Sequence, residues 1–254
     1  MVNFVVYISR VIFLRGINGY KNEDMFVLEL NNKFVRELPF NMRLFIEKIS
    51  GCVSDNTLIN CYKGSLGRKS DIYIVINKKI YGISLKNGIR NSLHSESLSS
   101  FCFFMKRCGF DDSLINIYKL YHFGDGSLTG SGLVRMSGSE CKKIMCEDIS
   151  KLNSAFNNCD FINKCVDRFI IGKGIDYLVN GTVDDFIWIS RFTIYKIMLF
   201  YSNYFMTCPH ISLMCVQPKM RCLNGSGSSG RFDIQIKWYN IFDMYLEYLY
   251  YNSI

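Results

Sequence analysis

The chain has 254 residues, of which 49% are hydrophobic, 15% aromatic and 20% charged. This composition is too apolar for an intrinsically disordered protein, and the length allows one large domain or two small ones. The 30 Lys and Arg residues exceed the 22 Asp and Glu residues, and the formal net charge of +8 favours a polyanionic partner such as nucleic acid.

The predicted elements are, in chain order, a helix at 21–38, strands at 71–76 and 80–86, a helix from about Ser92 to Cys108, helices at 141–169 and 188–204, a Gly-Ser loop at 224–230 and a strand at 231–238. This order favours a mixed α/β or α+β fold. No shift in composition marks a linker before Gly225, so we expect a single domain over residues 1–254.

The 11 cysteines contain no CxxC pair, which argues against a typical zinc site. The nearest approach to a ligand set is Cys208, His210, Cys215 and Cys222, whose wide spacing favours buried thiols. The N-terminal residues lack the basic region of a signal peptide, and no apolar stretch reaches about 20 residues without a charge. We therefore expect a cytoplasmic protein with reduced thiols and no association with a membrane.

Asp71 and Lys86 lie on the two predicted strands that flank a polar turn. If Lys78 and Lys79 form a two-residue loop, Asp71 lies opposite Lys86, and Ser84 shares their face of the sheet. A three-residue loop would move Lys86 to the other face. A carboxylate that holds Mg²⁺ beside an ammonium that orients water suits phosphodiester hydrolysis, whereas the alternative is a surface ion pair.

Glu23 is a second acid with an unusual position. At about 100° per residue it lies within about 60° of the apolar stripe of the first predicted helix, whereas Asp24 and Glu29 point away. An acid at the head of an apolar stripe is either a solvated stripe end, a helix cap or a residue that borders a site.

These residues resemble the PD-(D/E)xK nuclease superfamily, which includes many type II restriction endonucleases. Its members carry an aspartate, then an acid or glutamine, one residue and a lysine on such a hairpin. Asp71 and Lys86 match this pattern, whereas Ser84 stands at the position of the acid and is a poorer ligand for a hard cation. In some members the missing acid lies on the following helix, which implies Glu96 as a metal ligand. The family pattern also implies Glu23 and the Leu85 carbonyl as neighbours of the metal.

The order of short motifs is similar to that of HinP-type tetranucleotide-cutting restriction enzymes: Lys-Asn-Glu at 21–23, Lys-Ser-Asp at 69–71, Leu-Lys at 85–86, Gly-Arg at 230–231 and Ile-Gln at 234–235. The resemblance implies a restriction-endonuclease-like α/β fold with a mixed central sheet flanked by helices. It also implies Mg²⁺-dependent, sequence-specific cleavage of double-stranded DNA that leaves 5′ phosphates. The expected partners are a second copy of the chain, at least on DNA, and a cognate DNA methyltransferase that does not form a stable complex.

The C-terminal strand is predicted to present Arg231, Asp233, Gln235 and Lys237 on one face and apolar side chains on the other. Arg, Gln and Lys are the side chains that read bases in the major groove, although a solvated sheet face has the same pattern. Asn91 and His94 are further candidates for contact with DNA, or they cap the helix predicted to start near Ser92. The Gly-Ser loop would let the backbone follow a groove.

Three alternatives stay open at this point. The second candidate site combines Asp176 with Gln235 and Lys237, since Gln-x-Lys occurs there too. A repair or recombination nuclease of the same superfamily would prefer a mismatch or junction to a short sequence. The replacement of the usual acid by Ser84 also allows a DNA-binding protein on a degenerate, inactive nuclease fold.

Overall fold

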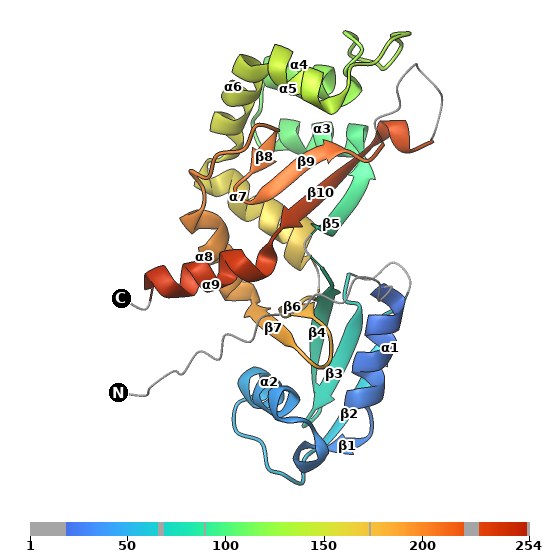
Figure 1. The fold of residues 1–254 in the computed structure, drawn as a ribbon, viewed down its shortest axis with the longest axis vertical. Coiled ribbons are helices and arrows are strands. Elements are labelled where there is room, and N and C mark those ends of the chain that lie inside the picture. The colour runs from blue at the N-terminus through green and yellow to red at the C-terminus, as the bar shows by residue number, and fades with distance from the viewer. Residues whose placement is uncertain (1–18, 66–68, 89, 173, 221–228, 253–254) are drawn as a thin grey trace. The chain divides into compact units, whose positions relative to one another are not determined.

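The computed structural model describes residues 19–65, 69–88, 90–172, 174–220 and 229–252 (Figure 1). The chain forms two compact units, each made of two segments. Unit 1 comprises residues 1–88 and 174–189, and unit 2 comprises residues 89–173 and 190–254. The single domain expected over residues 1–254 stays a prediction.

Unit 1 is built on a mixed six-stranded sheet in the order β1-β2-β3-β4-β6-β7. The strands are β1 (Lys33–Phe34), β2 (Leu58–Lys63), β3 (Ile72–Ile76), β4 (Lys79–Lys86), β6 (Tyr177–Gly181) and β7 (Phe186–Ser190). The pairs from β1 to β4 are antiparallel, whereas β4 and β6 are parallel.

The helices of unit 1 pack apolar side chains against this sheet. They are α1 (Gly19–Leu30), the 3₁₀ turn η1 (Val35–Glu37) and α2 (Phe40–Ser50). Phe26 of α1 and Phe45 of α2 are fully buried and both contact the ring of Phe186 edge-on, at 5.3 and 5.7 Å between ring centroids. These contacts pack α1, which carries Glu23, against β7 of the sheet, and α1 also lies against β2, β3 and β4.

The β3–β4 hairpin turns one residue earlier than the sequence predicts. Ile76 pairs with Lys79, so the two-residue turn is Asn77–Lys78, and both of these residues have positive φ angles of 49° and 68°. Such angles match a type I′ hairpin turn, in which Asn is favoured. The register therefore shifts by two residues and not by one, so the side chains of both strands keep their predicted faces.

Unit 2 is built on a four-stranded sheet in the order β5-β10-β9-β8, antiparallel throughout. The strands are β5 (Arg90–Ser97), β8 (His210–Ile211), β9 (Met214–Pro218) and β10 (Asp233–Tyr239). The helices are α3 (Leu98–Arg107), α4 (Asp112–Phe123), α5 (Gly138–Ile144), α6 (Cys146–Phe156), α7 (Cys159–Cys165), the π-helical turn η2 (Val166–Ile171), α8 (Arg191–Phe200), the 3₁₀ turn η3 (Ser229–Phe232) and α9 (Ile241–Asn252). Its core includes Phe101, Phe156, Phe169 and Trp238.

Three predicted helices are shorter than expected because strands replace one end. The helix predicted at 21–38 ends at Leu30, since Asn32 has a φ of 59° and the chain then enters β1. The helix predicted to start near Ser92 begins only at Leu98, where the Ser97 hydroxyl caps it by accepting a bond from Ser100 N. Residues 90–97 pair with β10 instead. Likewise, β7 occupies the first residues of the helix predicted at 188–204.

In the part of the chain that the structure describes, no helix is long and apolar enough to cross a membrane. Residues 224–228 of the predicted Gly-Ser loop, as well as Cys222, lie outside the described residues.

Candidate active site

Asp71 is the centre of a polar cluster at the end of the β3–β4 hairpin in unit 1. Its Oδ2 atom accepts hydrogen bonds from Leu85 N at 2.6 Å and from Ser84 Oγ at 3.1 Å. The ammonium of Lys86 lies 3.6 Å from the same oxygen. The predicted association of Asp71, Ser84 and Lys86 on one face is therefore confirmed. The backbone N–H of Asp71 donates to Ile83 O, which keeps Asp71 across from Ser84.

Glu23, in the first turns of α1, belongs to the same electrostatic neighbourhood. Its pKa is raised, first by burial and then by the negative charge of Asp71, whereas Lys63 and Lys86 act to lower it. Lys63 Nζ lies 3.8 Å from Glu23 Oε2 and 2.7 Å from Asp24 Oδ1. Lys63 was not predicted from the sequence, where its position on β2 gives no signal.

We call Glu23, Asp71, Ser84, Leu85 and Lys86 the unit 1 site. Two carboxylates that repel each other, with the Ser84 hydroxyl bonded to one of them, supply hard oxygen donors. This set fits Mg²⁺, which is commonly bound by one or two carboxylates with water and substrate phosphate filling the other positions. No group of three His, Cys, Asp or Glu side chains suited to a metal occurs among the described residues.

Glu96, the predicted replacement for the missing acid, lies in unit 2 on strand β5 and not on a helix. Its carboxylate forms an ion pair with Arg168, in which both oxygens accept from the guanidinium, and accepts a bond from Ser100 Oγ at 3.0 Å. Burial acts to raise the pKa of Glu96, but His94, whose Nε2 lies 3.7 Å from Oε2, and the hydrogen bonds from Arg168 outweigh it and lower the pKa to about 2. The carboxylate is thus fully engaged within its own unit, and its role as a metal ligand stays a prediction.

The outer face of the unit 2 sheet is polar along β10, as predicted for residues 233–238. Ile234, Ile236 and Trp238 are fully buried, while Asp233, Gln235 and Lys237 alternate with them and reach the surface. Three further polar residues share this face, because the register sets Ser95 and Gln217 opposite Gln235 and sets Ser92 opposite Lys237. Gln235 Nε2 donates to Ser92 Oγ at 3.0 Å. These neighbours were missed because no strand was predicted at either place.

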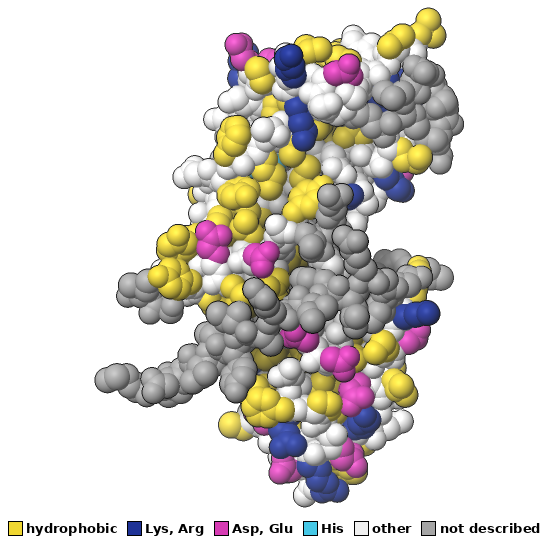
Figure 2. Space-filling view, in the orientation of Figure 1, with side chains coloured by type: hydrophobic (Ala, Val, Ile, Leu, Met, Phe, Trp, Pro, Cys, Tyr) yellow, Lys and Arg dark blue, Asp and Glu magenta, His cyan; other side chains and the backbone are white. Residues whose placement is uncertain are grey.

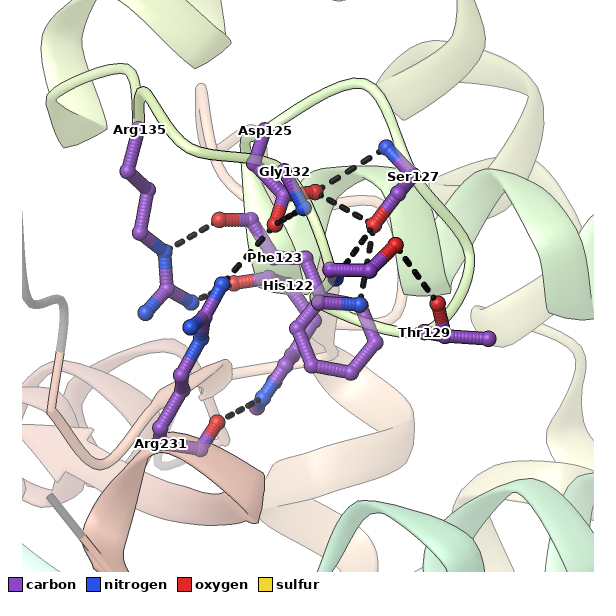
Figure 3. Close-up of polar contacts among 10 residues, drawn as sticks. His122, Phe123, Asp125, Ser127, Thr129, Gly132, Arg135 and Arg231 are labelled. Atoms are coloured by element: carbon purple, nitrogen blue, oxygen red, sulfur yellow. Dashed lines mark hydrogen bonds and ion pairs between the residues drawn. The ribbon is translucent and has the colours of Figure 1, made fainter. Parts of the chain in front are cut away.

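Arg231 does not continue this face, and the predicted alternation is wrong at this point. Arg231 lies in η3, is only 6% exposed, and donates from Nη2 to Asp125 Oδ2 at 2.9 Å (Figure 3). Its backbone oxygen is 2.8 Å from His122 Nε2. Phe232, expected on the buried apolar face of the strand, is 50% exposed, because the strand begins only at Asp233.

Asn91 and His94 also turn inward. Asn91 is buried opposite Trp238, and the His94 ring stacks on Phe169 with 5.3 Å between centroids. Neither residue caps a helix, since both lie within β5.

Two other constellations were predicted, and the one that combines Asp176 with Gln235 and Lys237 is divided between the two units and stays a prediction. Asp176 Oδ2 accepts from Gly82 N at 2.9 Å in unit 1, whereas Gln235 and Lys237 belong to unit 2. Of the Cys-His group, Cys208 and Cys215 place their sulfurs 3.1 Å apart, but the His210 ring nitrogen Nδ1 is 2.8 Å from Ser212 O.

Similarity to known proteins is found among solved structures. No protein-family model and no curated protein matches the chain. Among solved structures, the chain is similar to the restriction endonuclease MspI in complex with its cognate DNA, with a TM-score of 0.57 and 12% identity over 86% of this chain and 91% of that chain. The likeness confirms the expected fold class, a restriction-endonuclease-like α/β fold whose mixed sheet is flanked by helices.

Proposed function

We propose that the chain is a type II restriction endonuclease that cleaves double-stranded DNA at a specific sequence with Mg²⁺. The observation that carries this proposal is the unit 1 site, in which the Asp71 carboxylate is hydrogen-bonded to the end of β4 and lies 3.6 Å from the Lys86 ammonium. The fold that the chain shares with MspI supports it. A cytoplasmic location, a dimer on DNA and a cognate methyltransferase belong to the same proposal.

In this mechanism Asp71 and Glu23 would hold Mg²⁺, with the Leu85 carbonyl as a further ligand. Such an ion would polarise the scissile phosphate and lower the pKa of a water molecule. Lys86 orients the attacking water opposite the leaving 3′ oxygen and offsets negative charge that develops on the phosphate. Ser84 is not required as a ligand, because its hydroxyl donates to Asp71 Oδ2 and orients that carboxylate.

Recognition of the DNA sequence falls to the outer face of the unit 2 sheet. Gln235 and Lys237 offer the hydrogen-bonding groups that pair with adenine and guanine edges in a major groove. Gln217, directly opposite Gln235, adds a second amide on the neighbouring strand. Asp233 accepts bonds and, being 3.4 Å from Lys219, carries a counter-charge.

The test is cleavage of unmethylated phage and plasmid DNA by the purified protein, with Mg²⁺ and with chelator. Discrete Mg²⁺-dependent fragments that disappear with Asp71→Ala support the proposal, and Glu47→Ala, at an exposed position of α2, is the matched control. Fragments that persist with Asp71→Ala would refute the unit 1 site. Loss of cleavage with a folded Glu96→Ala variant would make Glu96 the second acid after all.

One observation favours a second candidate function. Ser84 replaces the acid that the resembling family carries, and the described residues contain only two carboxylates at the unit 1 site. A protein on a degenerate nuclease fold would bind DNA without cutting it. Retarded but intact DNA in the presence of Mg²⁺ would identify this alternative.

A further inference from the structure

Two helices of unit 2 leave aromatic side chains exposed. Phe192 and Phe200 of α8 are 67% and 46% exposed, and Tyr250 and Tyr251 of α9 are 64% and 57% exposed. The ring of Phe200 contacts that of Tyr251 at 6.1 Å, so the two exposed surfaces are continuous. In Figure 2 hydrophobic side chains gather where Figure 1 shows these helices. Contiguous exposed apolar surface of this kind marks an interaction site.

The exposed side chains form one stripe along each helix. On α8 the stripe is Phe192, Lys196 and Phe200, four residues apart, and Lys196 Nζ lies 4.5 Å from the centroid of the Phe192 ring. The opposite face of α8 carries Ile194 and Ile197, which are fully buried. This stripe is therefore aromatic with a cation at its centre.

The stripe on α9 has the opposite charge. Asp243, Glu247 and Tyr250 lie on its outer face, away from Ile241 and Tyr248, which face the core. Asp243 and Glu247 are the two charged residues of α9, whereas those of α8 are Arg191 and Lys196. The acidic stripe does not suit DNA, because it would repel phosphates.

We propose that the surface formed by the α8 and α9 stripes is the contact between two copies of this chain, with α8 of each copy against α9 of the other. A two-fold axis pairs a surface with itself, so a surface that carries one basic and one acidic stripe is self-complementary. Aromatic residues are also enriched in protein interfaces, whose rims are polar. The inference deepens the proposed function and rests on it in one respect, since the second copy supplies the second active site for cutting both strands.

A charge-swap experiment without DNA tests this interface. We expect sedimentation equilibrium to show a dimer for the wild-type protein at micromolar concentrations. Lys196→Glu and Glu247→Lys each place like charges at both symmetric contacts and should each raise the dimer dissociation constant more than about tenfold. An equimolar mixture of the two variants should restore the dimer, because opposite charges then meet at both contacts. Phe103→Glu on α3, 66% exposed in the same unit, is the control and should leave the dimer intact.

A wild-type monomer over the whole concentration range, or a mixture that stays monomeric, overturns the interface. The first result would also be found if the surface binds a different protein. Cleavage of DNA by the wild-type protein is scored separately, so the two proposals fail separately. If the protein is a dimer that does not cut DNA, the proposed nuclease activity is refuted and the interface is supported. If it is a monomer that cuts DNA, the interface is refuted and the nuclease activity is supported.

Discussion

The acidic side chains of the two units lie in opposite electrostatic environments. In unit 1, burial and the charge of Asp71 raise the pKa of Glu23; Lys63 lies 3.8 Å from Glu23, and Lys86 lies 3.6 Å from Asp71. In unit 2, nearby His94 together with hydrogen bonds from Arg168 and Ser100 lowers the pKa of Glu96. Carboxylates that repel each other leave a place for a cation, whereas a carboxylate with a guanidinium partner is already neutralised.

Asp125 of unit 2 follows the same rule as Glu96. Its buried carboxylate accepts bonds from Ser127 N and Oγ, from Gly132 N and from Arg231 Nη2 (Figure 3). Burial acts to raise its pKa, but these bonds lower it. Asp125 thus ties the loop after α4 to η3, just before β10. Glu96 and Asp125 of unit 2 are therefore engaged by hydrogen bonds within their own unit, whereas Glu23 and Asp71 of the unit 1 site repel each other.

The largest expected effect is on catalysis. Asp71→Asn keeps the side-chain shape and an oxygen that accepts from Leu85 N, but it removes the charge that would hold the metal ion. We therefore expect the cleavage rate to fall about 1,000-fold or more. The free energy of unfolding should change by no more than about 1 kcal/mol. Single-turnover cleavage and urea denaturation measure the two effects. Cleavage that keeps its rate would place the chemistry outside unit 1.

The second effect is on stability. Glu96→Gln leaves the Arg168 guanidinium without its counter-charge, and we expect a loss of about 2 kcal/mol in the free energy of unfolding, because the Glu96 side chain is only 10% exposed. Adding Arg168→Leu should recover part of this loss, since the unpaired charge is then removed. If the Glu96→Gln variant is as stable as the wild-type protein but fails to cut DNA, Glu96 has a role in cleavage and not in stability.

The pH dependence of stability gives a third test. Because the pKa of Glu96 falls from 4.5 to about 2 on folding, its contribution is complete above pH 4.5 and is lost as the pH drops towards 2. The partial exposure of Arg168, at 33%, limits this contribution to about 2 kcal/mol. The difference in unfolding free energy between the wild-type protein and Glu96→Gln should therefore shrink between pH 5 and pH 3. A difference that stays constant over this range would exclude the ion pair as its source.

The sequence predicted the unit 1 site better than the rest because its information is local. Asp71, Ser84 and Lys86 lie on one hairpin, and an error of one residue in the turn moved the register by two, which left all three on the same face. Glu23 was found from helical periodicity alone. Each of these inferences needs only the period of one element and one short turn.

Long-range pairing explains what the sequence did not predict. The serines of residues 90–97 indicate a helix cap, but their strand is formed only because β10, more than 130 residues later, supplies its hydrogen bonds. Arg231 looks like the first residue of an alternating strand, yet its partner is Asp125 on a distant loop. Neither partner can be identified from local periodicity, so Glu96 was assigned to the metal site and Arg231 to a DNA-reading surface.

The smallest predicted effect is a change in the titration of Glu23. Since the charge of Asp71 raises the pKa of Glu23, Asp71→Asn should lower that pKa towards its ordinary value, while burial keeps it raised in part. Carbon-13 NMR of the glutamate carboxyl groups measures it directly. Glu29, on the same helix and 2.9 Å from Lys33, is the internal control, because it points away from the site. If the pKa of Glu23 does not move, the two carboxylates are too far apart to share a cation, and Glu23 drops out of the proposed metal site.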